Sequence, residues 1–332
     1  MLISICIPTY NRPYSLLNCL NSLSLQTKKN FEVCISDNCS KTNIKKLIKP
    51  FKKKLNIKFK KNKKNLGFAI NVLNVSQMAK GDFIWFLGDD DLLVKNAIDS
   101  LTKILEKKKK CEFIWINSFH LDSKFLKKYP YPFNTKNLPS SMTKHSSQTK
   151  SRELPFFDLI DKKISFDFLL GIFVCAFKRE KWNENIKVAN LNLMKDVKPW
   201  SNFENTCFFI KIFCEAFSNS KAYLCAKPLS VSLYGVREWS NLYPFIEIVR
   251  IPEALDYYRS KGLGFLKYIS AKNFALRNFF NYFVKIFING DKMGFKYINL
   301  RRHFFSNLIY PNAWFSILYY INRRLKIFTK KF

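Results

Sequence analysis

The chain has 332 residues, 48% of them hydrophobic, which suffices for one large α/β domain or a domain with an appendage. Lys and Arg number 57 against 24 acidic residues, and the resulting formal charge of +33 attracts polyanions: nucleic acid, anionic lipid or phosphorylated substrates. Nine Cys without a C-x-x-C pair and three widely separated His argue against a disulfide framework, a zinc site or an imidazole metal cluster, and favour reduced, mostly buried thiols.

The N-terminus resembles a strand rather than a signal peptide. Residues 1–7 lack a positively charged start, and their apolar run stops at Pro8. The longest nearly apolar stretch, residues 166–177, contains Asp167 and is too short to span a bilayer. We therefore expect a cytoplasmic protein.

Strand and helix patterns alternate through the first part of the chain. This alternation predicts an α/β fold with a Rossmann-like, mostly parallel sheet and helices on both faces. Residues 134–152 are polar and contain Pro139, which indicates a mobile loop. The predicted strands are 2–7, 31–36, 56–59, 83–87 and 112–117, and the predicted helices are 13–25, 42–51, 68–78 and 92–105.

Three adjacent carboxylates, Asp89, Asp90 and Asp91, follow the buried strand predicted at 83–87. Ligands of open α/β sheets bind outside the carboxyl ends of the strands. Adjacent carboxylates repel one another unless a hard cation offsets their charge, and Mg²⁺ or Mn²⁺ typically takes one or two carboxylates together with substrate phosphates. The alternative is that these acids cap the helix predicted from residue 92. We favour the metal, because a cap needs only one or two acids.

Three further loops hold polar residues at the ends of predicted strands. Because parallel strands end at one edge of the sheet, we expect these loops to meet the acidic run around a single crevice. A tyrosine ring can stack on a base, a carboxylate can accept a hydrogen bond from a base edge, and a glycine before a helix lets the backbone approach an anion. The residues concerned are Pro8, Thr9, Tyr10 and Asn11; Asp37 and Asn38; and Asn65 and Gly67, ahead of a helix that carries Asn71.

These motifs occur together, in order and at the expected spacing, in a known family. The run from Ile5 to Arg12, the strand ending in Asp37, Asn65-Leu66-Gly67 with Asn71, and Gly81-Asp82 leading into the acidic run together resemble the family 2 glycosyltransferases of the GT-A fold. The resemblance covers residues 1–120 and thins afterwards.

The resemblance implies a nucleotide-sugar donor, a divalent cation (Mg²⁺ or Mn²⁺) and inversion at the anomeric carbon. It implies that Pro8 and Tyr10 flank the base, that Asp37 contacts it, that Asp89 lies near the ribose and that Asp90 holds the metal. Gly88 stands where the family commonly has an acid. The metal ligand is therefore one or more of Asp89, Asp90 and Asp91.

An acceptor hydroxyl is a poor nucleophile and must lose its proton to a nearby carboxylate as it attacks. Two candidates lie in the second half, Glu204 and Asp196. Glu204 resembles the family's Glu-Asp site, with Asn205 in place of the Asp. The alternative for Glu204 is a surface acid favoured by the helix dipole. His120 and Trp200 are candidates to line the acceptor site or simply to pack.

We expect residues 1–120 to form the nucleotide-sugar-binding half of the domain, 121–240 the acceptor-binding half, and 241–332 a basic, aromatic helical tail. The last 41 residues carry nine Lys or Arg and no acid. Such a mixture is typical of a segment that lies on an anionic membrane, although a helical cover or an oligomer contact would use the same aromatics. The tail residues considered are Trp314, Phe315, Tyr319, Tyr320, Arg323, Arg324 and Lys326.

The leading hypothesis is a metal-dependent inverting glycosyltransferase on the inner face of the plasma membrane. It would transfer sugar to a glycan or lipid-linked acceptor in the synthesis of bacterial surface polysaccharide or lipooligosaccharide. One rival is a catalytically silent family member; the other is a nucleic-acid-binding protein using the lysines of 52–64 and the tail. Residues 52–64 contain a single aromatic residue, Phe59, so we expect no nucleic-acid partner.

Overall fold

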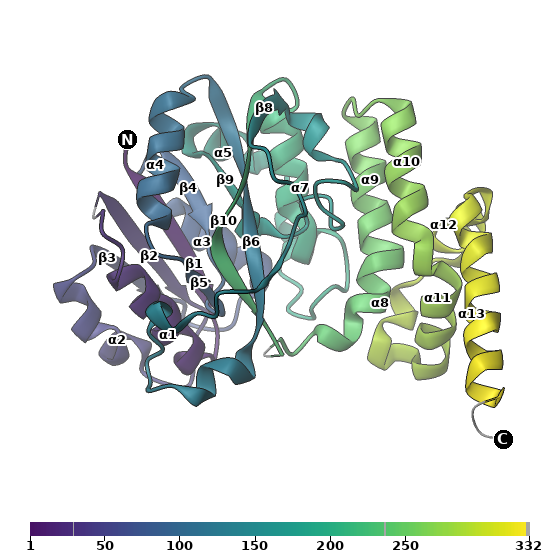
Figure 1. The fold of residues 1–332 in the computed structure, drawn as a ribbon, viewed down its shortest axis with the longest axis horizontal. Helices are drawn as coiled ribbons and strands as arrows, with labels where there is room; N and C mark the ends of the chain where they lie inside the picture. Colours follow the sequence, from purple (N-terminus) through teal and green to yellow (C-terminus); the bar gives the residue numbers. More distant parts are fainter. Residues whose placement is uncertain (29, 236, 330–332) are drawn as a thin grey trace.

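A mixed ten-stranded sheet forms the centre of the molecule, and a group of helices lies beside it at the C-terminal end (Figure 1). The computed structural model describes residues 1–28, 30–235 and 237–329, and side chains as far as residue 322. The strand order is β3-β2-β1-β4-β9-β6-β10-β5, with β7 paired to β6 and β8 to β10. The predicted α/β class is confirmed.

The N-terminal half of the sheet is parallel, as the sequence predicts. β1 pairs in parallel with both β2 and β4, and β2 pairs in parallel with β3. The apolar side chains alternate between the two faces along β1, so that Ile5 and Cys6 belong to different core clusters. These strands are β1 (Ile3–Thr9), β2 (Phe31–Asp37), β3 (Ile57–Lys61) and β4 (Phe83–Phe86).

The second half of the sheet contains antiparallel pairs. β9 pairs antiparallel with both β4 and β6, while β10 runs parallel to β6 and antiparallel to β5 and β8. β6 crosses residue 120, so the two expected halves of the domain share one sheet. These strands are β5 (Asp91–Leu93), β6 (Cys111–Asp122), β7 (Thr143–Lys144), β8 (Arg152–Pro155), β9 (Cys175–Lys178) and β10 (Lys221–Tyr234).

Helices cover both faces of the sheet. α1 (Pro13–Ser24) and α4 (Ala97–Lys107) bury leucines in the cluster on one face. α3 (Phe68–Gln77) and α7 (Glu204–Phe217) contribute to the larger cluster on the other face, where several phenylalanine rings pack edge to face. The short helices are α2 (Ile44–Leu47), α5 (Arg179–Asn185) and α6 (Leu191–Met194).

The C-terminal helical extension is present as predicted and packs beside α7 (Figure 1). Tyr258 of α9 is fully buried, and its hydroxyl donates a hydrogen bond to the Phe168 carbonyl at 2.9 Å, which ties the extension to the sheet domain. The helices are α8 (Tyr243–Phe245), α9 (Ile251–Ser260), α10 (Phe265–Ala275), α11 (Phe279–Asn289), α12 (Leu300–His303) and α13 (Pro311–Thr329).

Two predicted helices differ in the structure. The helix predicted from residue 92 begins at Ala97, because Asp91–Leu93 pairs with β10 as a strand; the acidic run therefore does not cap a helix. The helix predicted over 42–51 is broken into α2 and a 3₁₀ turn over Lys49–Lys53, since Pro50 has no N–H to continue the α-helical ladder.

All nine cysteines are unpaired, and eight of them are buried, as the scattered spacing predicts. The loop expected over 134–152 includes β7, and His145 and Ser146 within it are buried. Across the described part of the chain, no helix combines the length and apolar character that a bilayer crossing requires.

Candidate functional site

The carboxyl ends of β1, β2 and β4 meet at one edge of the sheet. Thr9 at the end of β1 is in register with Asp37 at the end of β2. The acidic run follows β4 directly and continues into β5, which pairs with β10. The structure thus brings together the polar residues that follow three separate strands.

Hydrogen bonds and ion pairs surround the first two carboxylates of the run. Thr9 Oγ1 donates a hydrogen bond to Asp89 Oδ2 at 2.7 Å. Arg12 Nη1 lies 3.5 Å from oxygens of both Asp89 and Asp90. Arg237 Nε, from the segment after β10, lies 3.4 Å from Asp90 Oδ2. Two guanidinium groups therefore face these two carboxylates.

Asp91 is the most deeply buried of the three, with 1% of its surface exposed. Its Oδ2 accepts a hydrogen bond from the Gly88 N–H at 3.0 Å. Its Oδ1 is buried and has no partner among the described residues. An unpartnered buried carboxylate oxygen is costly, so this atom is a candidate contact for a bound group.

The electrostatics of the run disfavour full ionisation. Burial raises the pKa of Asp89 to about 7, and the Asp90 charge adds to this shift, although Arg12 and Thr9 oppose it. Burial likewise raises the pKa of Asp91 to about 7, with Asp90 again adding and Arg237 opposing. A bound cation would favour the ionised forms of both groups.

The acidic run fits a hard cation that is held jointly with a ligand. Within the described ranges, no three His, Cys, Asp or Glu side chains form a ready-made metal cage. Mg²⁺ and Mn²⁺ need only one or two carboxylates when phosphates and water complete the shell. Gly88 leaves room for the two carboxylates that follow it, because a Cβ at this position would lie 2.7 Å from Asp90 Oδ1 and from Asp91 Oδ2.

Asp37 lies beside this run with one carboxylate oxygen occupied and one unpartnered. Its Oδ1 accepts a hydrogen bond from the Ser40 N–H at 2.9 Å, whereas its Oδ2 is buried without a partner among the described residues. Pro8 is half-buried, and Tyr10 is 40% exposed. An unpartnered acceptor beside an exposed ring suits recognition of a planar base.

The polar atoms of Asn38 are used within the protein. Its Nδ2 donates to Asn65 Oδ1 at 2.7 Å and to the Gly67 carbonyl at 3.2 Å, while its Oδ1 accepts from Asn62 Nδ2 and from the Leu66 N–H. These bonds hold the loop that leads into α3. Asn38 therefore shapes the crevice instead of offering free donors to a ligand.

Asn71 also bonds within the protein through both of its polar atoms, and Asn11 through its oxygen. Asn71 Oδ1 accepts from Ser36 Oγ at 2.7 Å, and its Nδ2 donates to the Ser36 carbonyl at 3.0 Å. Asn11 has a left-handed backbone, with φ 55°, and its Oδ1 accepts from the Lys41 N–H at 2.9 Å. Both side chains fix the loops on which the exposed residues stand.

The two carboxylates considered as bases have different surroundings. Glu204 is 2% exposed and forms an ion pair with Lys211, and its other oxygen accepts from the Asn190 N–H at 3.3 Å. Asp196 is exposed, and its pKa lies below its usual range because it accepts hydrogen bonds from the Ser201 hydroxyl and the Lys198 N–H.

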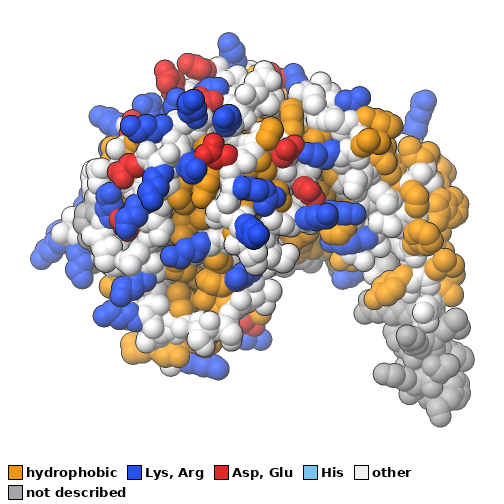
Figure 2. All heavy atoms as spheres, turned by 45° about the horizontal axis from the view of Figure 1, so that its top comes forward, with side chains coloured by type: hydrophobic (Ala, Val, Ile, Leu, Met, Phe, Trp, Pro, Cys, Tyr) orange, Lys and Arg blue, Asp and Glu red, His pale blue; other side chains and the backbone are white. Residues whose placement is uncertain are grey.

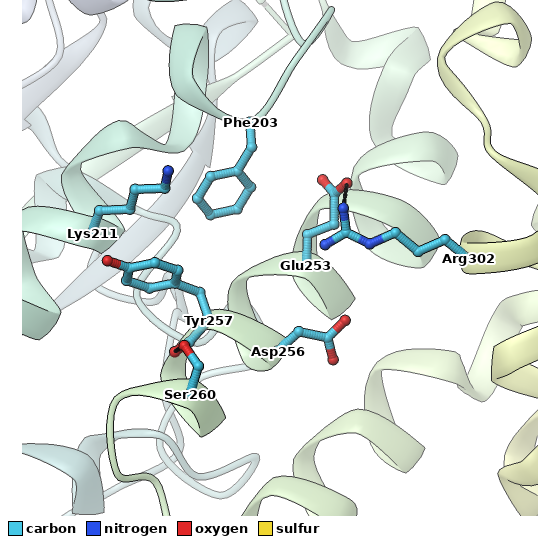
Figure 3. A pocket seen from close by; sticks show the side chains of 7 residues that line it. All are labelled: Phe203, Lys211, Glu253, Asp256, Tyr257, Ser260 and Arg302. Carbon is cyan, nitrogen blue, oxygen red and sulfur yellow. Dashed lines mark hydrogen bonds and ion pairs between the residues drawn. The ribbon is translucent and has the colours of Figure 1, made fainter. Parts of the chain in front are cut away.

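Asp196 also lies close to the crevice, whereas the ion-pair partner of Glu204 lines a different pocket. A Cβ on Gly67 would lie 3.3 Å from the Asp196 carbonyl, so this segment packs against the start of α3. Lys211, the partner of Glu204, lines a cavity of about 330 Å³ between α7, α9 and α12 (Figure 3). None of the three aspartates of the acidic run lines that cavity.

Asn205, which follows Glu204, has a structural role. Its Nδ2 donates to the carbonyls of Asp196 and Lys198 at 3.1 and 2.6 Å. A carboxylate here would repel both carbonyl oxygens, which explains the amide. Trp200, a candidate acceptor residue, is 8% exposed and packs against Trp239 at 5.5 Å between ring centroids.

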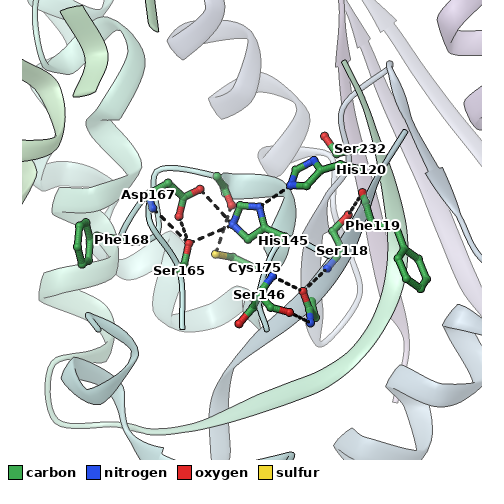
Figure 4. A network of polar contacts seen from close by, with 12 residues as sticks. Ser118, Phe119, His120, His145, Ser146, Ser165, Asp167, Phe168, Cys175 and Ser232 are labelled. Carbon is green, nitrogen blue, oxygen red and sulfur yellow. Dashed lines mark hydrogen bonds and ion pairs between the residues drawn. The ribbon is translucent and has the colours of Figure 1, made fainter. Parts of the chain in front are cut away.

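Sequence reasoning missed Arg237 and the partners of His120. Arg237 follows β10, whose position beside β5 is not evident from the sequence, and its Nη2 donates to Ser232 Oγ at 2.6 Å. His120 contacts His145, which in turn contacts Ser165 and Asp167 (Figure 4). The only available signal was that His120 and His145 are two of three histidines.

Comparison with known families and structures agrees with the fold described above. The profile of Glycosyl transferase family 2 matches residues 4–184, more than half of the chain. The chain is also similar in fold to a crystal structure of TarS 1-349 from Staphylococcus aureus in complex with UDP. That match has a TM-score of 0.57 and 15% identity, and covers 89% of this chain and 74% of TarS 1-349.

Two of the curated relatives match over about a third of this chain. The abequosyltransferase RfbV of Salmonella typhimurium is 41% identical over 110 residues, 32% of this chain and 33% of the relative. The poly(ribitol-phosphate) beta-N-acetylglucosaminyltransferase TarS of Staphylococcus aureus is 30% identical over 110 residues, 32% of this chain and 19% of the relative. The matched segments thus span a third or less of these two proteins.

Proposed function

Because the chain belongs to glycosyl transferase family 2, we propose that it transfers a sugar, with inversion, from a nucleotide-sugar donor to a hydroxyl of a glycan or lipid-linked acceptor. The main support is the convergence of Thr9, Asp37 and the acidic run at one edge of the sheet. The similarity to an abequosyltransferase and to TarS favours a role in bacterial surface polysaccharide or lipooligosaccharide synthesis.

In this proposal Asp37 accepts a hydrogen bond from the base through its unpartnered Oδ2, and Tyr10 stacks on the base beside Pro8. Asp89 is oriented toward the ribose by the Thr9 hydroxyl. The TarS 1-349 structures contain UDP or UDP-GlcNAc, which supports a uridine nucleotide as the first donor to test.

Asp90 and Asp91 would hold Mg²⁺ or Mn²⁺, which when bound supplies positive charge to the departing diphosphate. A mannosyltransferase from Pyrobaculum calidifontis, similar in fold with a TM-score of 0.50 and 12% identity, was solved with GDP-Man and Mn²⁺. Arg12 and Arg237 lie 3.4 to 3.5 Å from the carboxylates, and a diphosphate in the crevice would attract both guanidinium groups.

Asp196 is the better-supported base of the two candidates. Its carboxylate is exposed near the start of α3, where an acceptor hydroxyl could reach it. The carboxylate of Glu204 forms an ion pair with Lys211, and Glu204 therefore serves to position the start of α7. Asp196→Asn should lower turnover while nucleotide affinity is retained.

Calorimetric titration with UDP, GDP and other nucleoside diphosphates, with and without Mn²⁺, tests the donor part of the proposal. Metal-dependent binding of one nucleotide, followed by slow hydrolysis of its sugar conjugate, would support the enzyme. Nucleotide binding without hydrolysis or transfer would instead indicate the silent family member, which Gly88 and Asn205 keep in consideration. Tight binding of single-stranded nucleic acid without nucleotide binding would contradict the proposal.

We also propose that the C-terminal helices lie on an anionic membrane at the cytoplasmic face. Apolar side chains gather over these helices, at the right of Figure 2, and they include Trp314, Phe315 and Leu318, each more than half exposed. The chain from Lys292 onward has nine Lys or Arg and no acid, which complements anionic lipid. The side chains of Arg323, Arg324 and Lys326 lie outside the described residues.

Co-sedimentation with phosphatidylglycerol vesicles, compared with phosphatidylcholine vesicles, tests the membrane proposal. We expect anionic vesicles to retain the protein, and Phe315→Ser with Leu318→Ser to weaken retention. If the parent protein is retained by neither vesicle and forms dimers that the same substitutions dissociate, the face is an oligomer contact instead.

A further inference from the structure

A chain of buried polar groups runs from Asp167 through His145 to His120 (Figure 4). His120 Nε2 lies 3.1 Å from His145 Nδ1, and His145 Nε2 lies 3.0 Å from Ser165 Oγ and 3.5 Å from Asp167 Oδ2. His145, Ser165 and Asp167 are each less than a tenth exposed, while His120 is half-buried. The chain therefore leads from the interior to an accessible ring.

The backbone around Asp167 is built to receive its carboxylate. Phe168 and Leu169 have φ of 49° and 71°, a left-handed conformation that is costly for such side chains. A Cβ on Gly171 would lie 2.6 Å from Asp167 Oδ2, so only glycine leaves room for the carboxylate. Two strained residues and a required glycine indicate a site that does more than fill the core.

The hydrogen-bond pattern fixes where the protons lie. Ser165 has one hydroxyl proton, which it donates to Asp167, and its oxygen also accepts from the Asp167 N–H. The remaining contact of Ser165 must therefore be a hydrogen bond donated by His145 Nε2. In neutral His145, Nδ1 is then an acceptor, and His120 Nε2 must donate to it. Nδ1 of neutral His120 carries no proton as a result.

His120 lies beside the acidic run. It is in register with Ser232 of β10, which is in register with Asp91 of β5. Residues in register on neighbouring strands project from the same face, and two strand spacings place the Cα atoms of His120 and Asp91 roughly 10 Å apart. Arg237 contacts both Ser232 and Asp90, so it lies in the same row. No described residue forms a hydrogen bond with His120 Nδ1.

We infer that His120, held in one tautomer by His145 and Asp167, accepts a hydrogen bond at Nδ1 from a hydroxyl of the acceptor other than the attacking one, and so orients the acceptor toward the donor sugar. This inference rests on the proposed transfer reaction and adds an acceptor-binding residue to it. Asp167 and His145 act as positioning residues. Burial, followed by the charges of His145 and Arg237, lowers the pKa of His120 to about 4, which keeps the ring neutral and able to accept.

The tautomer is measured directly by NMR of protein labelled with ¹⁵N in histidine, since only three histidines must be assigned. We expect His120 Nδ1 without a proton and Nε2 with one in the parent protein. Asp167→Asn, which removes the negative end of the chain, should disturb this pattern. A protonated Nδ1 in the parent protein would overturn the inference, whatever the activity.

Release of nucleoside diphosphate from the donor chosen by calorimetry provides the functional measurement, with dodecyl glycosides as acceptor. We expect His120→Leu to lower the rate at saturating donor about 10-fold, with the donor KM unchanged. His120→Asn, whose amide lies near the position of Nδ1, should recover part of that loss. Phe119→Leu, at the neighbouring position on the opposite face, is the matched control.

Equal rates for His120→Leu and the parent protein would overturn the inference and leave the proposed function intact. Equal losses for His120→Leu and His120→Asn would show that Nδ1 is not the contact and would also overturn it. Absence of release by the parent protein with every nucleotide sugar would overturn both proposals together.

Discussion

Replacing Asp91 by Asn tests whether the acidic run carries unfavourable charge in the ligand-free protein. Asp91 is buried, and its folded pKa of about 7 is raised from 3.8. The folded protein therefore binds more protons than the unfolded chain between these values, so its stability falls as the pH rises from about 4 to about 7. Asn cannot ionise, so the stability of the variant lacks this part of the decrease with pH.

The magnitude follows from the size of the shift. Between about pH 5.5 and the folded pKa of about 7, the folded protein holds a proton on Asp91 that the unfolded chain has lost. Over these ~1.5 pH units the free energy of unfolding of the parent protein falls by 1.36 kcal/mol per unit, which is about 2 kcal/mol by about pH 8. We expect the free energy of unfolding of the variant, relative to the parent protein, to increase by about 2 kcal/mol between these pH values.

Urea unfolding at both pH values measures this difference. Asp99→Asn, on the partly exposed surface of α4, is the matched control and should show the same difference from the parent protein at both pH values. If the Asp91→Asn difference is likewise independent of pH, the reasoning about buried charge is refuted.

Four further substitutions test other parts of the site. Thr9→Val removes the hydroxyl that donates to Asp89 and should weaken metal-dependent nucleotide binding about 10-fold, as measured by calorimetry. Unchanged affinity would show that the hydrogen bond between Thr9 and Asp89 does not contribute to nucleotide binding. Gly88→Ala places a Cβ 2.7 Å from two carboxylate oxygens and should abolish the metal dependence of that binding; retention would show that the run can move aside. Lys211→Met should destabilise the protein by about 3–5 kcal/mol in urea, because it leaves Glu204 buried and unpaired. Asp196→Asn should leave that stability within about 0.5 kcal/mol but lower turnover; the reverse pattern for these two variants would make Glu204 the base.

The sequence predicted the parts of the fold that rest on local patterns. The strands that end at Thr9, Asp37 and Phe86 carry apolar runs bounded by polar loops, so the strands and their shared edge could be anticipated. The start of the helix after the acidic run was wrong by several residues. Asp91–Leu93 is a strand only because it pairs with β10, more than a hundred residues away in sequence, and no local pattern reveals such a partner.

The same distinction applies to the site. Asp37 and the acidic run could be proposed because each directly follows a strand. Arg237 lies beside the acidic run only through the pairing of β10, and Asp167 approaches His145 through the packing of an irregular segment. Asn38 and Asn71 show a further limit: their position was predicted correctly, but only the structure shows that their amides are used in holding loops.

The measurement that tests the central claim most directly is donor turnover by the parent protein, Asp90→Asn and Asp91→Asn, each with Mn²⁺ and with a chelator. A site in which these carboxylates hold a cation against the departing diphosphate predicts that the parent protein loses turnover with chelator, and that both variants are impaired with Mn²⁺ present. Parental turnover by both variants in the presence of chelator would contradict that claim.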